Sequence, residues 1–210
     1  MGPGDAAPAA RRPGRHRQPG LRQLACDGCW YLLERGDTRT AFGLASGLRQ
    51  QWRDRLGADH EHALEIGDYL CWALEQMGRW ADARDLAQDT LGRSRRVLGE
   101  DDPETLNNLS NLGVYLRDLG EVPAARDLHQ DALERRLRVL GEDHPSTLFT
   151  ANNLAADLRA LGEARAARDL DQDTLDRRRR ILGQDHPDTL TSAENLAADL
   201  RALGEAGNNT

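Results

Sequence analysis

The chain repeats itself every 42 residues. Residues 98–139 and 140–181 are identical at 25 of 42 positions, and residues 140–164 and 182–206 are identical at 20 of 25. A fixed period of this length is typical of stacked arrays, in which each unit buries its apolar side only against its neighbours. The sequence therefore predicts an array of small repeated units, and it favours binding over catalysis as the class of function.

Each unit has the pattern of two helices. Within residues 98–139, five leucines share one helix face and predict a first helix over about 104–119: Leu106, Leu109, Leu112, Leu116 and Leu119. Asp102 and Pro103 fit the N-cap and the first residue of this helix, and Gly120 fits its end. A second apolar stripe predicts a second helix over about 122–139, with arginines in its last turn, where the helix dipole favours cations.

The same pattern divides the chain into four helix pairs and one half pair. The predicted units are about 21–55, 56–97, 98–139 and 140–181, followed by a half unit at 182–206 with a helix over about 187–203. Residues 1–20 carry Pro, Gly, Ala and Arg without periodicity, so we expect a disordered tail there. Residues 207–210 are expected to form a short C-terminal tail.

The charge balance excludes some classes of partner. The formal net charge is −7, from 35 acidic and 28 basic residues, which disfavours binding to nucleic acid or to anionic membranes. No apolar run reaches the ~18 residues of a membrane span, and no apolar segment follows the N-terminal arginines as in a secretory signal. We therefore expect a cytoplasmic protein. All basic residues are Arg, which favours an origin in a GC-rich, actinobacterial-like genome.

Small and apolar residues recur at fixed positions of the unit. Leu112-Gly113, Leu116, Gly120, Ala125 and Ala132-Leu133 resemble the pattern of the tetratricopeptide repeat, and Trp80 matches the aromatic that often opens the second helix. The extra eight residues and the Gly-x-Asp-His-Pro-x-Thr-Leu start at 141–148 resemble the long repeats of kinesin light chains and of similar bacterial proteins. The resemblance implies an all-α, right-handed superhelix of antiparallel helix pairs over residues 21–206. The chain departs from the pattern at the second-helix aromatic, where His129 and Asp171 stand.

The cysteines include a Cys-x-x-Cys motif at Cys26 and Cys29. Cys29 and Cys71 lie one period apart, at a position that is later filled by small residues, and buried Cys behaves as a small apolar group. Zinc takes four ligands, and no second Cys pair completes a set. The sequence therefore predicts structural thiols, with no metal and no cofactor.

Three Asp-His pairs invite a catalytic interpretation, at Asp59-His60, Asp143-His144 and Asp185-His186. Each pair precedes a predicted helix start, and copies one unit apart, roughly 10 Å, do not converge on one site. We interpret them as helix caps. Because the chain also lacks phosphate-binding loops, nucleophile elbows and His-Glu-x-x-His motifs, we expect no enzyme activity. The basic run 177–180 is interpreted as a helix-end cluster beside acidic residues of the following turn, such as Asp185.

The resemblance also implies a peptide groove on the concave face of the first helices. Its predicted floor is a column of asparagines, whose amides can both donate to and accept from an extended backbone. A column of arginines beside it can hold carboxylates with paired hydrogen bonds. The predicted groove residues are Asn111, Asn153, Asn195, Arg117, Arg159, Arg201, Asn107, Phe149, Tyr69, Trp72 and Trp30.

These expectations favour a non-enzymatic adaptor that binds a protein or peptide with acidic residues in its groove. One alternative is a sensor arm that works with a switch-type ATPase. Another is a self-assembling array, because Leu190, Leu196 and Leu200 on the last helix lack a predicted partner helix. That helix is therefore also a candidate for homodimer formation.

Overall fold

The computed structural model describes residues 20–204, and all of the secondary structure in that range is helical. The predicted tails at 1–20 and 207–210 lie outside the described residues, apart from Gly20. The helices are α1 (Leu21–Glu34), α2 (Thr38–Leu56), α3 (Glu61–Gln76), α4 (Trp80–Val97), α5 (Pro103–Asp118), α6 (Val122–Leu140), α7 (Pro145–Ala160), α8 (Ala164–Leu182) and α9 (Pro187–Ala202). The three helices whose limits were predicted, α5, α6 and α9, are confirmed to within one residue.

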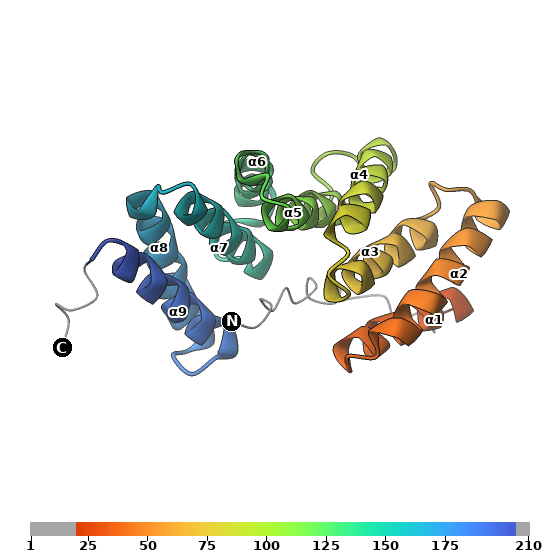
Figure 1. Ribbon diagram of the computed structural model, residues 1–210, viewed down its shortest axis with the longest axis horizontal. Coiled ribbons are helices and arrows are strands. Elements are labelled where there is room, and N and C mark those ends of the chain that lie inside the picture. The colour runs from red at the N-terminus through yellow and green to blue at the C-terminus, as the bar shows by residue number, and fades with distance from the viewer. Residues whose placement is uncertain (1–19, 205–210) are drawn as a thin grey trace.

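The helices form a curved array rather than a single core. Each helix packs against the next in the chain. Direct contacts also join α1 to α3, α5 to α7, and α7 to α9. Figure 1 shows that α3, α5 and α7 lie toward the inner side of the arch, while α2, α4, α6 and α8 lie toward the outer side. This arrangement confirms the all-α array of helix pairs.

Glycines with positive φ end the helices and set the period of the fold. In the turns that follow the first helices, φ lies between 69° and 83° at Gly36, Gly78, Gly120, Gly162 and Gly204. Gly57, Gly99, Gly141 and Gly183 have φ from 87° to 97° after the second helices. Residues with a Cβ rarely adopt this backbone conformation, so glycine at these positions stops each helix.

Small residues let the two helices of a pair come together. Ala41, Ala83, Ala125 and Ala167 lie one period apart on the second helices and are all fully buried. In the third pair, the Cβ of an alanine at Gly113 would lie 2.6 Å from His129 Nε2, so only glycine fits against that ring. The departure from the family pattern at His129 is therefore matched by the missing side chain at Gly113.

The starts of α3, α5, α7 and α9 carry the predicted side-chain caps, and in each Asp-His pair the histidine is the residue that caps. The Nδ1 atoms of His60, His144 and His186 accept the backbone N–H two residues later, at 3.2, 3.1 and 3.2 Å. Asp102 caps α5 in the same way through its carboxylate, at 2.9 Å. The histidine is thus the cap, which leaves the preceding aspartate free for an ion pair.

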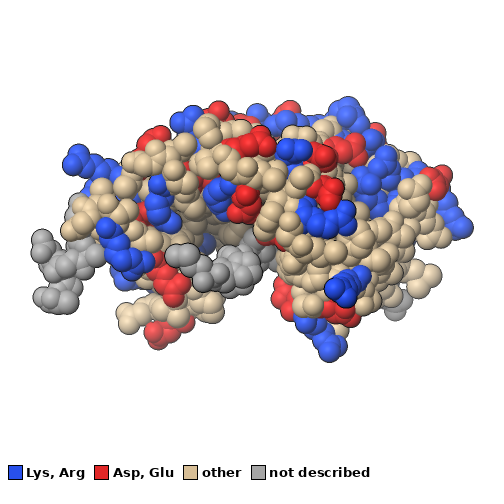
Figure 2. All heavy atoms as spheres, in the orientation of Figure 1, with Lys and Arg blue, Asp and Glu red and all other residues tan. Residues whose placement is uncertain are grey.

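The arginines of the run 177–180 pair with the turn that opens their own unit, so the predicted pairing with Asp185 is wrong, whereas Arg95 of the second unit does reach Glu100 of the following turn, at 3.0 Å. Arg177 and Arg180 form ion pairs with Asp143, at 3.1 and 2.7 Å, and not with Asp185. Arg135 and Arg138 reach Asp101 in the same way. The physical reason is the antiparallel hairpin, which returns the end of the second helix to the start of the first. Figure 2 shows basic and acidic side chains interspersed over the visible face.

Among the described residues, no helix combines the length and the apolar character that crossing a membrane requires.

Candidate peptide-binding face

The predicted asparagine column lies on the first helices of the last three units. Asn111, Asn153 and Asn195 lie one period apart on α5, α7 and α9, and all three are half-buried. Among the described residues, no side-chain amide of this column has a hydrogen-bond partner, although the backbone oxygens of Asn153 and Asn195 accept from arginines. The column therefore offers amide groups that the fold itself does not use.

The middle member of the column is the most unusual. The Nδ2 atom of Asn153 is buried and has no hydrogen-bond partner in the described structure. A buried donor without a partner costs about 1–3 kcal/mol, so proteins rarely keep one without a use.

Asn107 and Phe149 share the register position four residues before the asparagine column. They differ in whether the side chain is free to contact a ligand. Asn107 Oδ1 accepts a hydrogen bond from Arg136 Nη2 at 2.6 Å, so this amide is already bound within the fold. Phe149 is half-buried on α7.

The three aromatic residues predicted at the N-terminal end of the face are half-buried. Tyr69 and Trp72 pack against a core cluster of Leu33, Ala41 and Ala73, which fixes one side of each ring. Trp30 is likewise half-buried, on α1. This end of the face therefore presents apolar surface that is held in place by the core.

The arginine column has a different use from the predicted one. Arg117 Nη1 lies 3.1 Å from Asp157 Oδ1, and Asp157 is fully buried on the following first helix. Arg159 Nη2 lies 2.9 Å from Asp171, and its Nε contacts Asp199. Both guanidinium groups thus already hold carboxylates of this chain. Only Arg201, on α9, is exposed.

These arginines belong to buried polar layers between successive units. His129 Nδ1 contacts Asp157 Oδ2, and His129 Nε2 lies 3.0 Å from the carbonyl oxygen of Ser110. Both ring nitrogens of His129 therefore face oxygen atoms that can accept hydrogen bonds. One unit later Asp171 replaces the histidine, and burial together with its hydrogen bond to Asp199 raises the pKa of Asp171 to about 8.

Sequence reasoning missed the acidic partners of these layers. Asp157 and Asp199 occupy the register position of Ala73 and Tyr115, which are buried. A charged residue at a buried register position requires a partner, and this signal was available in the 42-residue alignment.

The thiols are buried, in agreement with their predicted structural role. Cys26, Cys29 and Cys71 are free and buried. Burial raises the pKa of Cys29 to about 11, and it also raises the pKa values of Cys26 and Cys71. None of the three is therefore poised as a nucleophile at neutral pH. The Cys26 sulfur, however, lies close to His62 and Glu65 of α3.

A curved stack of antiparallel helix pairs, with small residues at the helix crossings and an inner face of first helices, defines an α-solenoid. The model of the tetratricopeptide repeat family matches the chain at residues 69–137, 109–180 and 149–207. The chain belongs to this family, whose domains are generally protein-interaction scaffolds and typically non-catalytic.

Solved structures with the same fold include long-repeat arrays. The chain is similar to the nearly identical TPR-like repeats of a candidate kinesin light chain from Podosopora anserina, with a TM-score of 0.75 and 21% identity over 87% of each chain. A variant of that protein gives a TM-score of 0.76 at 21% identity, over 87% of this chain and 86% of the other. BtubC (BKLC) from P. vanneervenii gives 0.76 at 21% identity, over 89% of this chain and 74% of the other. No curated protein sequence matches the chain.

Proposed function

We propose that this array is a non-catalytic scaffold that binds an extended peptide segment of a protein partner along its inner face. The observation that carries the proposal is the column Asn111, Asn153 and Asn195, with its uncommitted amides and one buried donor. An extended backbone offers alternating C=O and N–H groups that such amides can bind from successive helices.

The aromatic side chains at the other end of the face complete the proposed site. Trp30, Tyr69 and Trp72 would receive apolar side chains of the peptide, since rigid aromatic surface contributes much of the affinity in such interfaces. The expected preference for acidic ligands is dropped, because Arg117 and Arg159 already hold internal carboxylates.

The test compares two triple variants of the full chain. Peptides selected from a displayed random library would be measured by fluorescence polarisation against Asn111→Ala/Asn153→Ala/Asn195→Ala. Losing about 1 kcal/mol for each of the three asparagines predicts an affinity lower by about 100-fold. The matched control replaces Gln88, Gln130 and Gln172, which are exposed at the same period on the outer helices. Equal loss in both variants, or in neither, would refute the inner face as the site.

A specific observation also favours self-association through α9. Leu190 is 51% exposed, whereas Leu148, one unit earlier, is 4% exposed. The predicted apolar stripe is partly wrong, because Leu196 is buried against the preceding pair. If α9 mediates dimers, light scattering at tens of micromolar will show a dimer that Leu190→Ser dissociates. A monomeric mass for the unmodified chain would exclude this second function.

The alternative of a sensor arm for a switch-type ATPase stays a prediction.

A further inference from the structure

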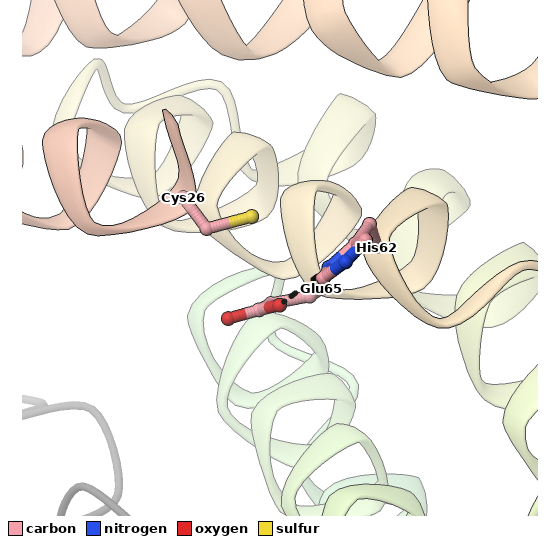
Figure 3. Close-up of side chains that lie close together, drawn as sticks. All are labelled: Cys26, His62 and Glu65. Atoms are coloured by element: carbon pink, nitrogen blue, oxygen red, sulfur yellow. Dashed lines mark hydrogen bonds and ion pairs between the residues drawn. The ribbon is translucent and has the colours of Figure 1, made fainter. Parts of the chain in front are cut away.

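Three side chains with metal-binding chemistry converge between the first and second units. Cys26 lies on α1, and His62 and Glu65 lie on α3. The sulfur, a ring nitrogen and a carboxylate oxygen all lie within 4.8 Å of one another. Figure 3 shows the Cys26 sulfur directed from α1 toward the His62–Glu65 pair. The group thus joins two helices that are distant in sequence.

The positions follow from the helix geometry. His62 and Glu65 are three residues apart, so they share one face of α3, and α1 packs directly on α3. Cys26 is fully buried, whereas the side chains of His62 and Glu65 are 17% and 32% exposed. One donor is therefore fixed by the core, and two can adjust at the surface.

The combination of residues is not a general feature of the repeat. One unit later the equivalent positions hold Asp68, Glu104 and Asn107, and the unit after that holds Ser110, Ser146 and Phe149. Sulfur, imidazole and carboxylate donors occur together only at the first junction. Packing of the fold does not require them, since the other junctions form without them.

The charge around the group favours a cation. Glu65 Oε1 accepts a hydrogen bond from Gln23 at 3.1 Å, and Glu65 Oε2 lies 3.5 Å from His62 Nδ1. No arginine is among the contacts of Glu65 in the described residues, whereas Asp59 and Asp101 are held by two arginines each. The Glu65 carboxylate is thus left without a permanent positive partner.

We propose that Cys26, His62 and Glu65 bind one divalent transition-metal ion, best matched by Zn²⁺, with water in the fourth position. Thiolate, imidazole and carboxylate are the donors that Zn²⁺ prefers, at ~2.0–2.3 Å in a tetrahedral arrangement. Rotation of the partly exposed His62 and Glu65 side chains would let the three donors, which already lie within 4.8 Å of one another, close on one ion. Binding releases the Cys26 thiol proton to solvent, and the ion then joins α1 to α3.

This proposal replaces the sequence-based expectation of no metal, and its ligands differ from the Cys-x-x-Cys motif. Cys29 is not a member of the group, and the missing ligands come from α3 rather than from a second Cys pair. The signal in the sequence was the His62-x-x-Glu65 spacing on the helix that packs on Cys26. The proposal does not rest on the proposed peptide binding, although Glu65 occupies the register position of the groove residues Asn107 and Phe149.

The test titrates the full chain with Co²⁺ and then displaces it with Zn²⁺. We expect one equivalent to bind, with a thiolate-to-cobalt charge-transfer band and the d–d bands of a tetrahedral site. Cys26→Ser should abolish the charge-transfer band, and Cys29→Ser, which changes a buried cysteine on the same helix, should keep it. His62→Ala and Glu65→Gln should each lower the affinity about tenfold or more.

The partly exposed ligands keep the test decisive if Cys26→Ser fails to fold. Circular dichroism would establish that His62→Ala and Glu65→Gln retain the helices before titration. Absence of saturable binding near one equivalent in the unmodified chain would overturn the proposal. So would a charge-transfer band that survives Cys26→Ser or disappears in Cys29→Ser, and so would unchanged affinity in both α3 variants.

Discussion

The two halves of this array fill the same register positions with opposite chemistry. Between the first and second units, the inter-unit layer consists of Leu33, Ala45 and Ala73, all buried and apolar. Between the fourth unit and α9, the equivalent positions hold Arg159, Asp171 and Asp199, joined by ion pairs. The helices and turns are nevertheless equivalent, so the backbone of the repeat accommodates either solution.

A second set of positions follows the same trend. Trp52 and Ile66 are buried in the apolar core of the first units. Two units later these positions are Arg136 and Thr150, and Arg136 Nη1 donates to the carbonyl oxygen of Ser146 at 2.8 Å. Burial lowers the pKa of Arg136 to about 10, which leaves it charged at neutral pH.

The difference teaches what each kind of layer contributes. Apolar contacts are not directional, so the N-terminal layers gain stability from buried area and tolerate changes of shape. Ion pairs and hydrogen bonds in a buried layer require defined geometry, and their net stabilisation is small once desolvation is counted. The C-terminal layers therefore fix which unit packs on which, and their stability is more sensitive to the loss of one partner.

The largest effect is expected from breaking a polar layer. Asp157→Ala leaves Arg117 and His129 without their carboxylate in a buried site, and we expect a loss of about 3–5 kcal/mol in the free energy of unfolding. The control is Tyr115→Phe, one unit earlier at the same register position, with an expected loss below about 1 kcal/mol. Urea unfolding followed by circular dichroism measures both. Similar losses at the two positions would contradict the proposed difference between the halves.

A steric test addresses the contact between Gly113 and His129. Gly113→Ala places a Cβ 2.6 Å from the ring, and we expect a loss of about 1–3 kcal/mol. The same substitution in a His129→Ala background should cost nothing further, because the second unit pairs Cys71 with Ala87 at these positions. Gly92→Ala is the matched control, since its Cβ meets no atom within 4 Å. If Gly113→Ala is as harmless as this control in thermal unfolding, the close packing is refuted.

A third test concerns pH. The pKa of Asp171 is raised in the folded chain to about 8 by burial and by Asp199, so between about pH 4 and pH 8 the folded state holds a proton that the unfolded state releases. Stability should therefore fall as the pH rises through this window. Asp171→Asn should flatten this dependence in urea unfolding at a series of pH values. Glu75, whose pKa burial raises to about 7, contributes a slope of the same sign, so the difference between variant and parent is the relevant quantity. An identical slope in both proteins would argue against the raised pKa of Asp171.

The sequence predicted the helices and their caps because these depend on local signals that repeat every 42 residues. Each end of α5 is set by residues close to it in the sequence, such as the N-cap Asp102 beside Pro103. The use of Arg117 could not be read in the same way, because Asp157 lies 40 residues later on another helix. The Cys26 group was missed for the same reason, since its ligands meet only when α1 packs on α3.

The pairing of Arg117 with Asp157, and of Arg159 with Asp199, also bears on how such a gene can lengthen. A tandem duplication of residues 140–181 would place a new Asp157 beside the old Arg159, so the added unit would dock without further mutation. Duplicating residues 56–97 would instead bring Ala73 against Glu75, two side chains selected for other neighbours. Residues 140–181 therefore carry the matched charges of an interchangeable module, whereas residues 56–97 carry side chains that suit only their present neighbours.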